Sequence, residues 1–133
     1  MNHTPVAIGL LICEQVIVEE KTRNVTPVNC FTHRKVVGFP SEPFPFVVFS
    51  VLADGLGEMP LEVRIYRLDT FGEVYRTVAA TIRFTDPLQS VRFQLRIRDV
   101  SFPVPGHYDV ALLADGEMIA QRKLVILQKE TAT

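Results

Sequence analysis

The side chains that could carry nucleophilic catalysis are two cysteines and three histidines. A cysteine nucleophile needs a base within hydrogen-bond reach, and usually a third group that orients the base. Cys30 and His33 form the one pair close enough in sequence to consider, but residues three apart in a strand point to opposite faces. His3 lies near a chain end and His107 lies in a turn. We therefore predict no catalytic residues and a protein that is not an enzyme.

The sequence gives equally little indication of a metal site or a phosphate site. A structural zinc site wants about four cysteine or histidine ligands, commonly in close pairs, and the sequence has no Cys-x-x-Cys or His-x-x-x-His. Gly55 and Gly57 are not followed by the lysine and helix of a phosphate loop. Asp54, Glu58 and Glu62 match no calcium loop, and a solvated acidic hairpin is the better interpretation. We expect no metal and no cofactor.

Arginines offer a possible polyanion surface. Arg92, Arg96 and Arg98 fall on one face of a strand, and Arg64 and Arg83 point outward from other strands. If these strands are neighbours, their side chains form a basic stripe that could contact phosphates. The net charge of −1 gives no general attraction to nucleic acid. A solvated or ion-paired face is the preferred interpretation, and nucleic-acid or polyanion binding is the alternative.

An excess of apolar residues is the most informative feature. Residues 44–52 are apolar on both faces of the expected strand, although a two-sheet sandwich needs only one apolar face per strand. The second face must then be covered by a loop, a second copy or a partner. Residues 24–39 could supply a cover within the chain, and an interface between subunits is the competing hypothesis. The candidate interface residues are Phe44, Val47, Phe49 and Val51.

The elements around these residues show a period of two almost throughout. Residues 91–98 alternate strictly between apolar and polar side chains, which predicts a strand with one buried face. Asp115-Gly116 supplies the positive φ angles of a tight hairpin turn, so the two strands around it should pair antiparallel. No segment has the pattern of an amphipathic helix. We predict an all-β fold, an antiparallel two-sheet sandwich of about eight strands.

The length of 133 residues fits one domain spanning the whole chain, with residues 1–5 and 129–133 expected to be frayed. The apolar run at residues 6–13 is far shorter than the roughly 20 residues of a membrane span. No basic residue precedes it and no small-residue cleavage pattern follows, so it does not resemble a signal peptide. We predict a cytoplasmic protein that binds no membrane, in which Cys13 and Cys30 are reduced thiols.

Residues 102–112 resemble the penultimate strand of immunoglobulin-like sandwiches. In those proteins a Pro-Gly-x-Tyr turn leads into an alternating strand, and the tyrosine hydroxyl often bonds to a nearby loop. Pro105, Gly106 and Tyr108 match this turn, so the resemblance implies a structural role for Tyr108. The chain has no tryptophan, which separates it from antibody domains.

The order of segments over nearly the whole chain is similar to that of small, stand-alone, uncharacterised bacterial β-sandwich proteins. The resemblance rests on the strand at residues 12–20 with its Lys-Thr-Arg turn, the Phe-Pro-Phe-Val run at residues 44–47, and the late Pro-Gly-x-Tyr strand. It implies an immunoglobulin-like fold and a bacterial source. It implies no activity, because no catalytic residues come with it.

These observations favour a non-enzymatic protein–protein interaction or assembly module that forms homo-oligomers. Its expected partner is a second copy or another protein, which the sequence does not identify. The second hypothesis is a polyanion binder acting through Arg92, Arg96 and Arg98. The third is a small enzyme or ligand-binding sandwich, which would require a deep pocket lined by His33 or His107 together with a carboxylate.

Overall fold

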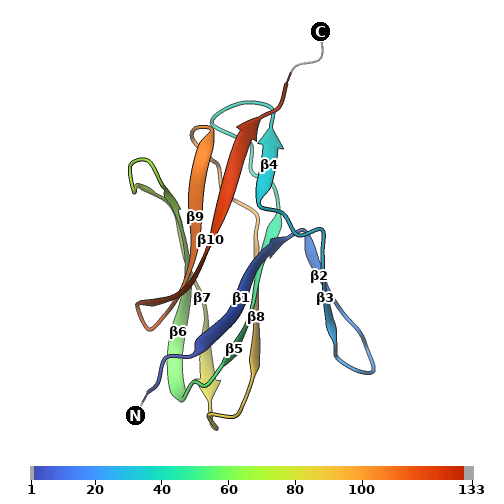
Figure 1. Ribbon diagram of the computed structural model, residues 1–133, viewed down its shortest axis with the longest axis vertical. Helices are drawn as coiled ribbons and strands as arrows, with labels where there is room; N and C mark the ends of the chain where they lie inside the picture. Colours follow the sequence, from blue (N-terminus) through green and yellow to red (C-terminus); the bar gives the residue numbers. More distant parts are fainter. Residues whose placement is uncertain (1, 131–133) are drawn as a thin grey trace.

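A computed structural model describes residues 2–130, which form ten named strands and a separate bridge (Figure 1). The strands are β1 (Val6–Cys13), β2 (Gln15–Val18), β3 (Val25–Val28), β4 (His33–Val36), β5 (Phe46–Ala53), β6 (Gly57–Arg67), β7 (Glu73–Phe84), β8 (Val91–Ile97), β9 (Gly106–Ala114) and β10 (Glu117–Gln128). The described residues contain no helix long and apolar enough to cross a membrane.

The strands are arranged as two facing sheets with a small ribbon beside them. One sheet has the order β1-β5-β8 and the other the order β4-β10-β9-β6-β7, while β2 and β3 pair only with each other. Figure 1 shows the two sheets as layers, with the β2–β3 ribbon projecting from the side of the three-stranded sheet. The predicted all-β two-sheet sandwich is confirmed. It is not purely antiparallel, because β4 runs parallel to β10.

Local sequence accounts for the clearest elements. Along β8, Phe93 and Ile97 are buried while Arg92 and Arg96 are exposed, as strict alternation predicts. Asp115 and Gly116 adopt φ angles of 52° and 81° and join β9 to β10 in an antiparallel pair. Positive φ at both positions gives the turn a twist that matches the flanking strands.

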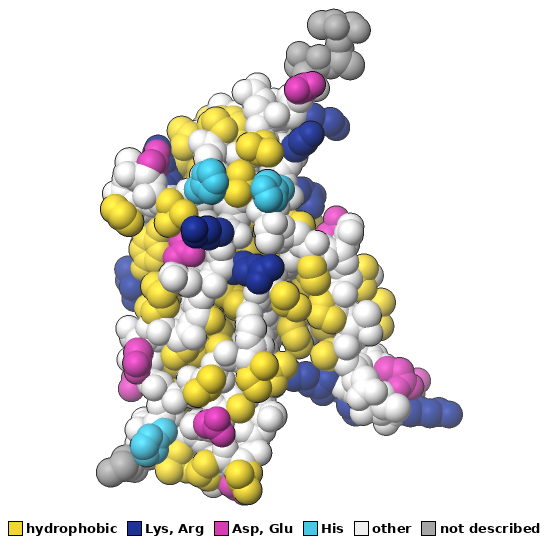
Figure 2. Space-filling view, in the orientation of Figure 1, with side chains coloured by type: hydrophobic (Ala, Val, Ile, Leu, Met, Phe, Trp, Pro, Cys, Tyr) yellow, Lys and Arg dark blue, Asp and Glu magenta, His cyan; other side chains and the backbone are white. Residues whose placement is uncertain are grey.

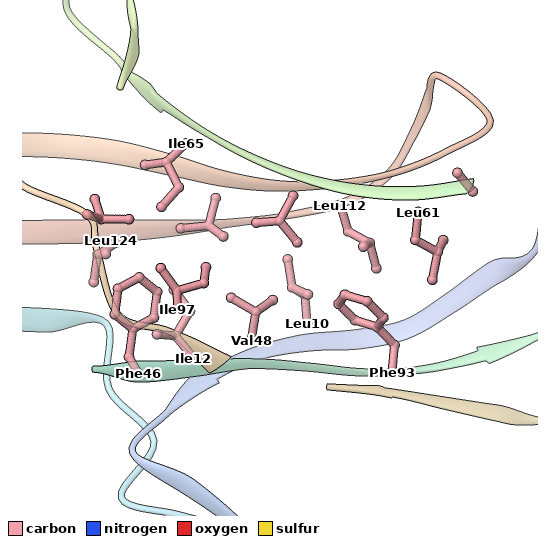
Figure 3. Close-up of a cluster of buried hydrophobic side chains, with 14 of the residues drawn as sticks. Leu10, Ile12, Phe46, Val48, Leu61, Ile65, Phe93, Ile97, Leu112 and Leu124 are labelled. Carbon is pink, nitrogen blue, oxygen red and sulfur yellow. The ribbon is translucent and has the colours of Figure 1, made fainter. Parts of the chain in front are cut away.

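The core lies between the two sheets (Figure 3). Branched aliphatic side chains from both sheets fill it, with Phe46 and Phe93 from the three-stranded sheet. Its labelled members are Leu10, Ile12, Phe46, Val48, Phe93 and Ile97 on one side and Leu61, Ile65, Leu112 and Leu124 on the other. Ser50 also points inward, and its hydroxyl donates to the carbonyl of Gly9, so this buried polar group is satisfied.

The number of strands exceeds the expected eight because two segments divide differently. Residues 6–20 form two strands, since the chain leaves β5 after Cys13 and the amide of Glu14 donates to the carbonyl of Val28, 3.0 Å away. The stretch at residues 24–39 contains β3 as well as β4. Pro27 interrupts the β pattern of that stretch, but it is tolerated because a two-stranded ribbon leaves one edge of each strand unpaired.

Both ends of the described chain make backbone hydrogen bonds. His3 and Leu56 exchange two backbone hydrogen bonds of 2.8 and 3.1 Å, and Lys129 donates its amide to the carbonyl of Val36 at 2.7 Å. Residues 1–5 and 129–133 are the segments expected to be frayed, and these bonds involve one residue of each. Residue 1 and residues 131–133, which belong to the same expectation, lie outside the described residues.

Candidate interaction surface

The candidate surface is the outer face of the three-stranded sheet, meaning the side chains of β1, β5 and β8 that point away from the core. Strand register arranges these side chains in four rows. From one end to the other, the rows are Cys13–Val47–Arg96, Leu11–Phe49–Gln94, Ile8–Val51–Arg92 and Val6–Ala53. The face is therefore apolar on its β1 and β5 columns and polar, with two arginines, on its β8 column.

Buried side chains of the outer face lie within two of these rows. Val47 and Phe49 expose only 4% and 6% of their surface, and Cys13 is fully buried. These side chains point away from the core between the sheets, so another part of the molecule must exclude water from them. We call this part of the face, formed by Cys13, Val47 and Phe49, the covered zone.

The β2–β3 ribbon supplies cover for that zone. It begins directly after Cys13, and β2 contacts β5. The far end of the ribbon is fastened as well, because the guanidinium of Arg92 donates to the backbone carbonyl of Arg23. The half-buried Val16, Val25 and Pro27 show that the ribbon itself is packed on one side. The cover within the chain that the apolar excess required is thus present.

The remaining apolar part of the face is open. Val6 and Ile8 expose 56% and 62% of their surface, and Val51 beside them is half-buried. We call these three residues the open zone. They lie on and next to β1, which is an edge strand of its sheet. Figure 2 shows hydrophobic side chains in the recess between the sandwich and the projecting ribbon, whose end carries both acidic and basic groups.

Phe44 does not lie on this face. It precedes β5 and belongs to an aromatic cluster, with ring centroids 5.7 Å from Phe46 and 5.8 Å from Phe102. The Arg34 guanidinium lies 4.6 Å from the centroid of the Phe44 ring, a cation–π distance. Phe44 also lines a groove of about 700 Å³ between β4 and the proline-rich loop that follows. The four candidate interface residues therefore occupy two different places.

The arginines are divided between the two sheets. Arg92, Arg96 and Arg98 are exposed on or just after β8, and none of the three forms an ion pair within residues 2–130. Arg64 lies on β6 in the other sheet, where its guanidinium is 3.0 Å from a carboxylate oxygen of Glu62. A stripe that includes Arg64 is therefore excluded by the fold, and the basic surface is confined to β8 and its end.

Tyr108 is held at the start of β9 by its hydroxyl group. The hydroxyl donates to the carbonyl of Val104 at 2.6 Å and accepts from the amide of the same residue at 3.3 Å. Burial raises the pKa of Tyr108, so the group stays protonated and able to donate. The ring packs edge-on against Phe102, with centroids 4.9 Å apart. The residue fixes the loop that brings β9 back across the sandwich.

Replacing Tyr108 with phenylalanine should lower the free energy of unfolding by about 1–2 kcal/mol, because it leaves buried backbone groups of Val104 without their partner. Urea denaturation followed by circular dichroism measures the change. Tyr66→Phe is the matched control, since the Tyr66 hydroxyl only accepts a long 3.4 Å contact from Arg64. Equal losses in the two variants would contradict a structural role specific to Tyr108.

His107 and His33 are the two histidines that could line a catalytic pocket. His107 lines a hollow of about 400 Å³ together with Arg67 and Asp69. Asp69 accepts two hydrogen bonds from Arg67, of 3.0 and 2.7 Å, and these bonds lower the pKa of its carboxyl. The carboxylate is thus held by Arg67 and is a poor partner for His107. His33 instead has its Nδ1 3.0 Å from the hydroxyl of Thr32.

Metal binding has no candidate in the part of the chain that the structure describes. No group of three or more histidine, cysteine or acidic side chains there is arranged to hold an ion. Asp54, Glu58 and Glu62 do not converge on such a site. Cys13 and Cys30 are both free thiols, the first buried and the second exposed.

Val6 and Ile8 were not among the candidate residues from the sequence. Their signal was present, because they alternate with Ala7, which packs against the core. It was obscured by a bulge at Gly9, where φ is 74° and the register with β5 shifts between Ile8 and Leu11. The bulge moves the outer face from even to odd residue numbers, so no single period of two describes the strand.

The distribution of the strands between the two sheets defines the class of protein. β5 and β8 share one sheet while β6, β9 and β10 share the other, as the B and E strands and the C, F and G strands do in immunoglobulin domains. The chain is an immunoglobulin-like sandwich with an inserted ribbon. It belongs to a family of unknown function, DUF6941, whose match covers residues 9–127.

Two of the solved structures that match this chain come from pseudomonads. An immunoglobulin-like protein of Pseudomonas aeruginosa is 13% identical, with a TM-score of 0.48, over 93% of this chain and 97% of that one. The alkylpurine DNA glycosylase AlkC of Pseudomonas fluorescens, solved bound to DNA containing an abasic site analog, is 14% identical over 71% of this chain, with a TM-score of 0.49. The chain spans 27% of that glycosylase. No match was found among curated proteins. At these values neither likeness carries an argument about function.

Proposed function

We propose that this protein is a non-enzymatic protein–protein interaction module that pairs with a second copy of itself through the open zone. The observation that carries the proposal is the exposure of Val6 and Ile8 on an edge strand, next to the half-buried Val51. Large apolar side chains that cluster on one exposed face gain about 1.5–3 kcal/mol each when a partner buries them fully.

A second copy suits this surface better than a charged ligand. An interface around a two-fold axis brings the same patch of both subunits together, so the patch must be self-complementary. An apolar centre at Val6 and Ile8 meets this condition without pairing like charges. The nearest arginine, Arg92, is already bonded to the ribbon carbonyl of Arg23 and lies at the rim of the open zone.

Ile8→Glu is the variant that tests this proposal. We expect the purified protein to elute with twice the 15.0 kDa mass of one chain in size exclusion with light scattering. The variant should weaken self-association roughly tenfold or more, because the interface would have to bury a carboxylate. Its circular dichroism should remain that of the parent, since Ile8 is 62% exposed in a single chain, so the lost association would not result from unfolding.

Val37→Glu is the matched control, because Val37 is 77% exposed but follows β4 in the other sheet. This variant should still self-associate. A monomer at all protein concentrations, or equal loss in both variants, would contradict pairing through the open zone. If the parent is monomeric, a heterologous partner that binds it but not Ile8→Glu would assign the face to another protein.

Polyanion binding is the second candidate, and one observation favours it. Arg96 and Arg98 are exposed and take part in no ion pair among the described residues. Absorbance at 260 nm in the same chromatography tests it, since a chain without tryptophan absorbs weakly in the ultraviolet. Co-purified nucleic acid that dissociates as salt rises, and is lost when Arg92, Arg96 and Arg98 become glutamine, would support this candidate over self-association.

A further inference from the structure

The two cysteines lie opposite each other where the ribbon joins the sandwich. Gln15 is paired with Val28 in the ribbon, and the amide of Phe31 donates to the carbonyl of Ile12 at 2.9 Å. The Ile12–Phe31 contact is antiparallel and places Cys13 across from Cys30, next to an irregularity where Glu14 and Gln15 both face Val28 and Asn29 has a φ of 59°. The backbone of β1 and that of residues 28–31 therefore run side by side through the cysteine pair.

The two thiol side chains leave the backbone on the same face. Ile12 and Phe31 both pack against the core. Side chains alternate along paired strands, so the neighbouring Cys13 and Cys30 both point to the outer face. The carbonyl of Ile12 accepts from Phe31, and the amide of Glu14 donates to Val28. Successive residues of a strand turn their backbone groups to opposite sides, so the backbone groups of Cys13, which lies between these two residues, face β5.

Cys13 and Cys30 thus form a non-hydrogen-bonded cross-strand pair, the arrangement that brings opposite side chains closest. The Cα atoms of such a pair are typically about 4.5 Å apart, within the range of about 4.4–6.8 Å that disulfides span. The titration of Cys13 agrees with this proximity. Burial raises the pKa of its thiol most, and the charge of Cys30 is the next cause of the increase.

We propose that Cys13 and Cys30 are a reversible disulfide site that fastens the base of the β2–β3 ribbon to the sandwich. The oxidant class is a peroxide, and the reductant class is a dithiol. Cys30 is the exposed member and reacts first, while the buried Cys13 resolves the intermediate. The site is independent of the proposed self-association.

The reaction balances in two steps. The Cys30 thiolate attacks hydrogen peroxide, the O–O bond breaks, and a sulfenic acid and hydroxide form. The Cys13 sulfur then attacks the Cys30 sulfur, the S–O bond breaks, and the sulfenic oxygen leaves as water after taking up the Cys13 proton. Two thiols are oxidised by two electrons in total, and one peroxide is reduced to two waters.

The bond would convert residues 13–30 into a closed loop. Loop closure restricts the unfolded chain, so the oxidised protein should be more stable than the reduced protein. The ribbon that begins and ends at these two cysteines covers Val47 and Phe49. Closing the loop therefore also keeps the ribbon packed over the covered zone. The oxidation state of the two cysteines would then affect how much of this apolar surface is exposed.

Peptide mapping of the folded, full-length protein after hydrogen peroxide treatment tests the site. Free thiols are blocked with iodoacetamide, and trypsin releases Cys13 in residues 1–21 and Cys30 in residues 24–34. We expect these two peptides to be joined within one chain, without a disulfide between chains, in more than half of the chains, and dithiothreitol should separate them. The melting temperature of the oxidised protein should rise by roughly 5–15 °C.

Cys30→Ser is the control, because this exposed residue can change without disturbing the core. Peroxide should neither link peptides nor raise the melting temperature in this variant. Cys13→Ala provides a second variant that lacks the link without placing a hydroxyl in a buried position. Three results would overturn the proposal: dimers joined through Cys30, over-oxidation of Cys30 with Cys13 still free, or linked peptides that form only in denaturant.

Discussion

Replacing Phe46 with alanine is expected to lower the free energy of unfolding by about 3–5 kcal/mol, which is a large part of the about 5–15 kcal/mol available to a domain of this size. Phe46 is 0% exposed at the start of β5. Its ring centroid lies 5.7 Å from that of Phe44 and 6.5 Å from that of Phe31, which it meets edge-on. The substitution would leave a cavity between the sheets and remove aromatic contacts on two sides.

Guanidinium denaturation followed by circular dichroism measures this loss. Phe71→Ala is the matched control, because Phe71 is 77% exposed in the turn between β6 and β7 and should change stability by less than about 0.5 kcal/mol. If Phe46→Ala lost less than about 1 kcal/mol, the aromatic cluster would not be part of the core in solution.

Val47→Arg is the second substitution with a large expected effect, a loss of about 2–4 kcal/mol. Val47 is buried on the outer face, so an arginine there must either bury its charge or displace the ribbon. Hydrogen exchange should accordingly speed up in residues 15–28 of the variant. Because the covered zone is covered within one chain, this loss should occur in a monomer.

Ile8→Arg separates this effect from the mere addition of charge to the outer face. Ile8 is exposed, so the control should keep its stability within about 0.5 kcal/mol. Hydrogen exchange in the ribbon should also be unchanged. If both variants stay fully stable and Val47→Arg shows no faster hydrogen exchange, the ribbon does not cover Val47 in solution.

The elements that sequence alone predicted best are those determined by neighbouring residues. Strand β8 followed from its strict alternation, and the β9–β10 hairpin from Asp115-Gly116. The division of residues 6–20 was not predictable, because no proline or turn signal marks the point near Glu14 where the chain leaves β5. The parallel pairing of β4 with β10 joins segments that are far apart in sequence, and no local pattern specifies it.

The candidate surface, too, was predictable only where neighbouring residues determine it. The apolar pattern of β5 correctly indicated that its second face needed a cover, because alternation assigns each side chain to a face. It could not indicate what the cover was, since the ribbon is positioned by long-range contacts such as that of Arg92 with Arg23. The open zone was missed because a single glycine with positive φ changed which residues of β1 face outward.

The parallel contact between β4 and β10 also affects when the fold can form during synthesis. His33 to Val36 pair with Val125 to Gln128, so β4 cannot complete its pairing until β10, far later in the sequence, has been made. The β2–β3 ribbon needs only its own residues and can form much sooner. Completion of the larger sheet therefore depends on a long-range contact, with the millisecond-to-second folding typical of β-sandwiches. Until β10 pairs with it, β9 has an unpaired edge, and this is the interval in which a nascent chain would most need protection from aggregation.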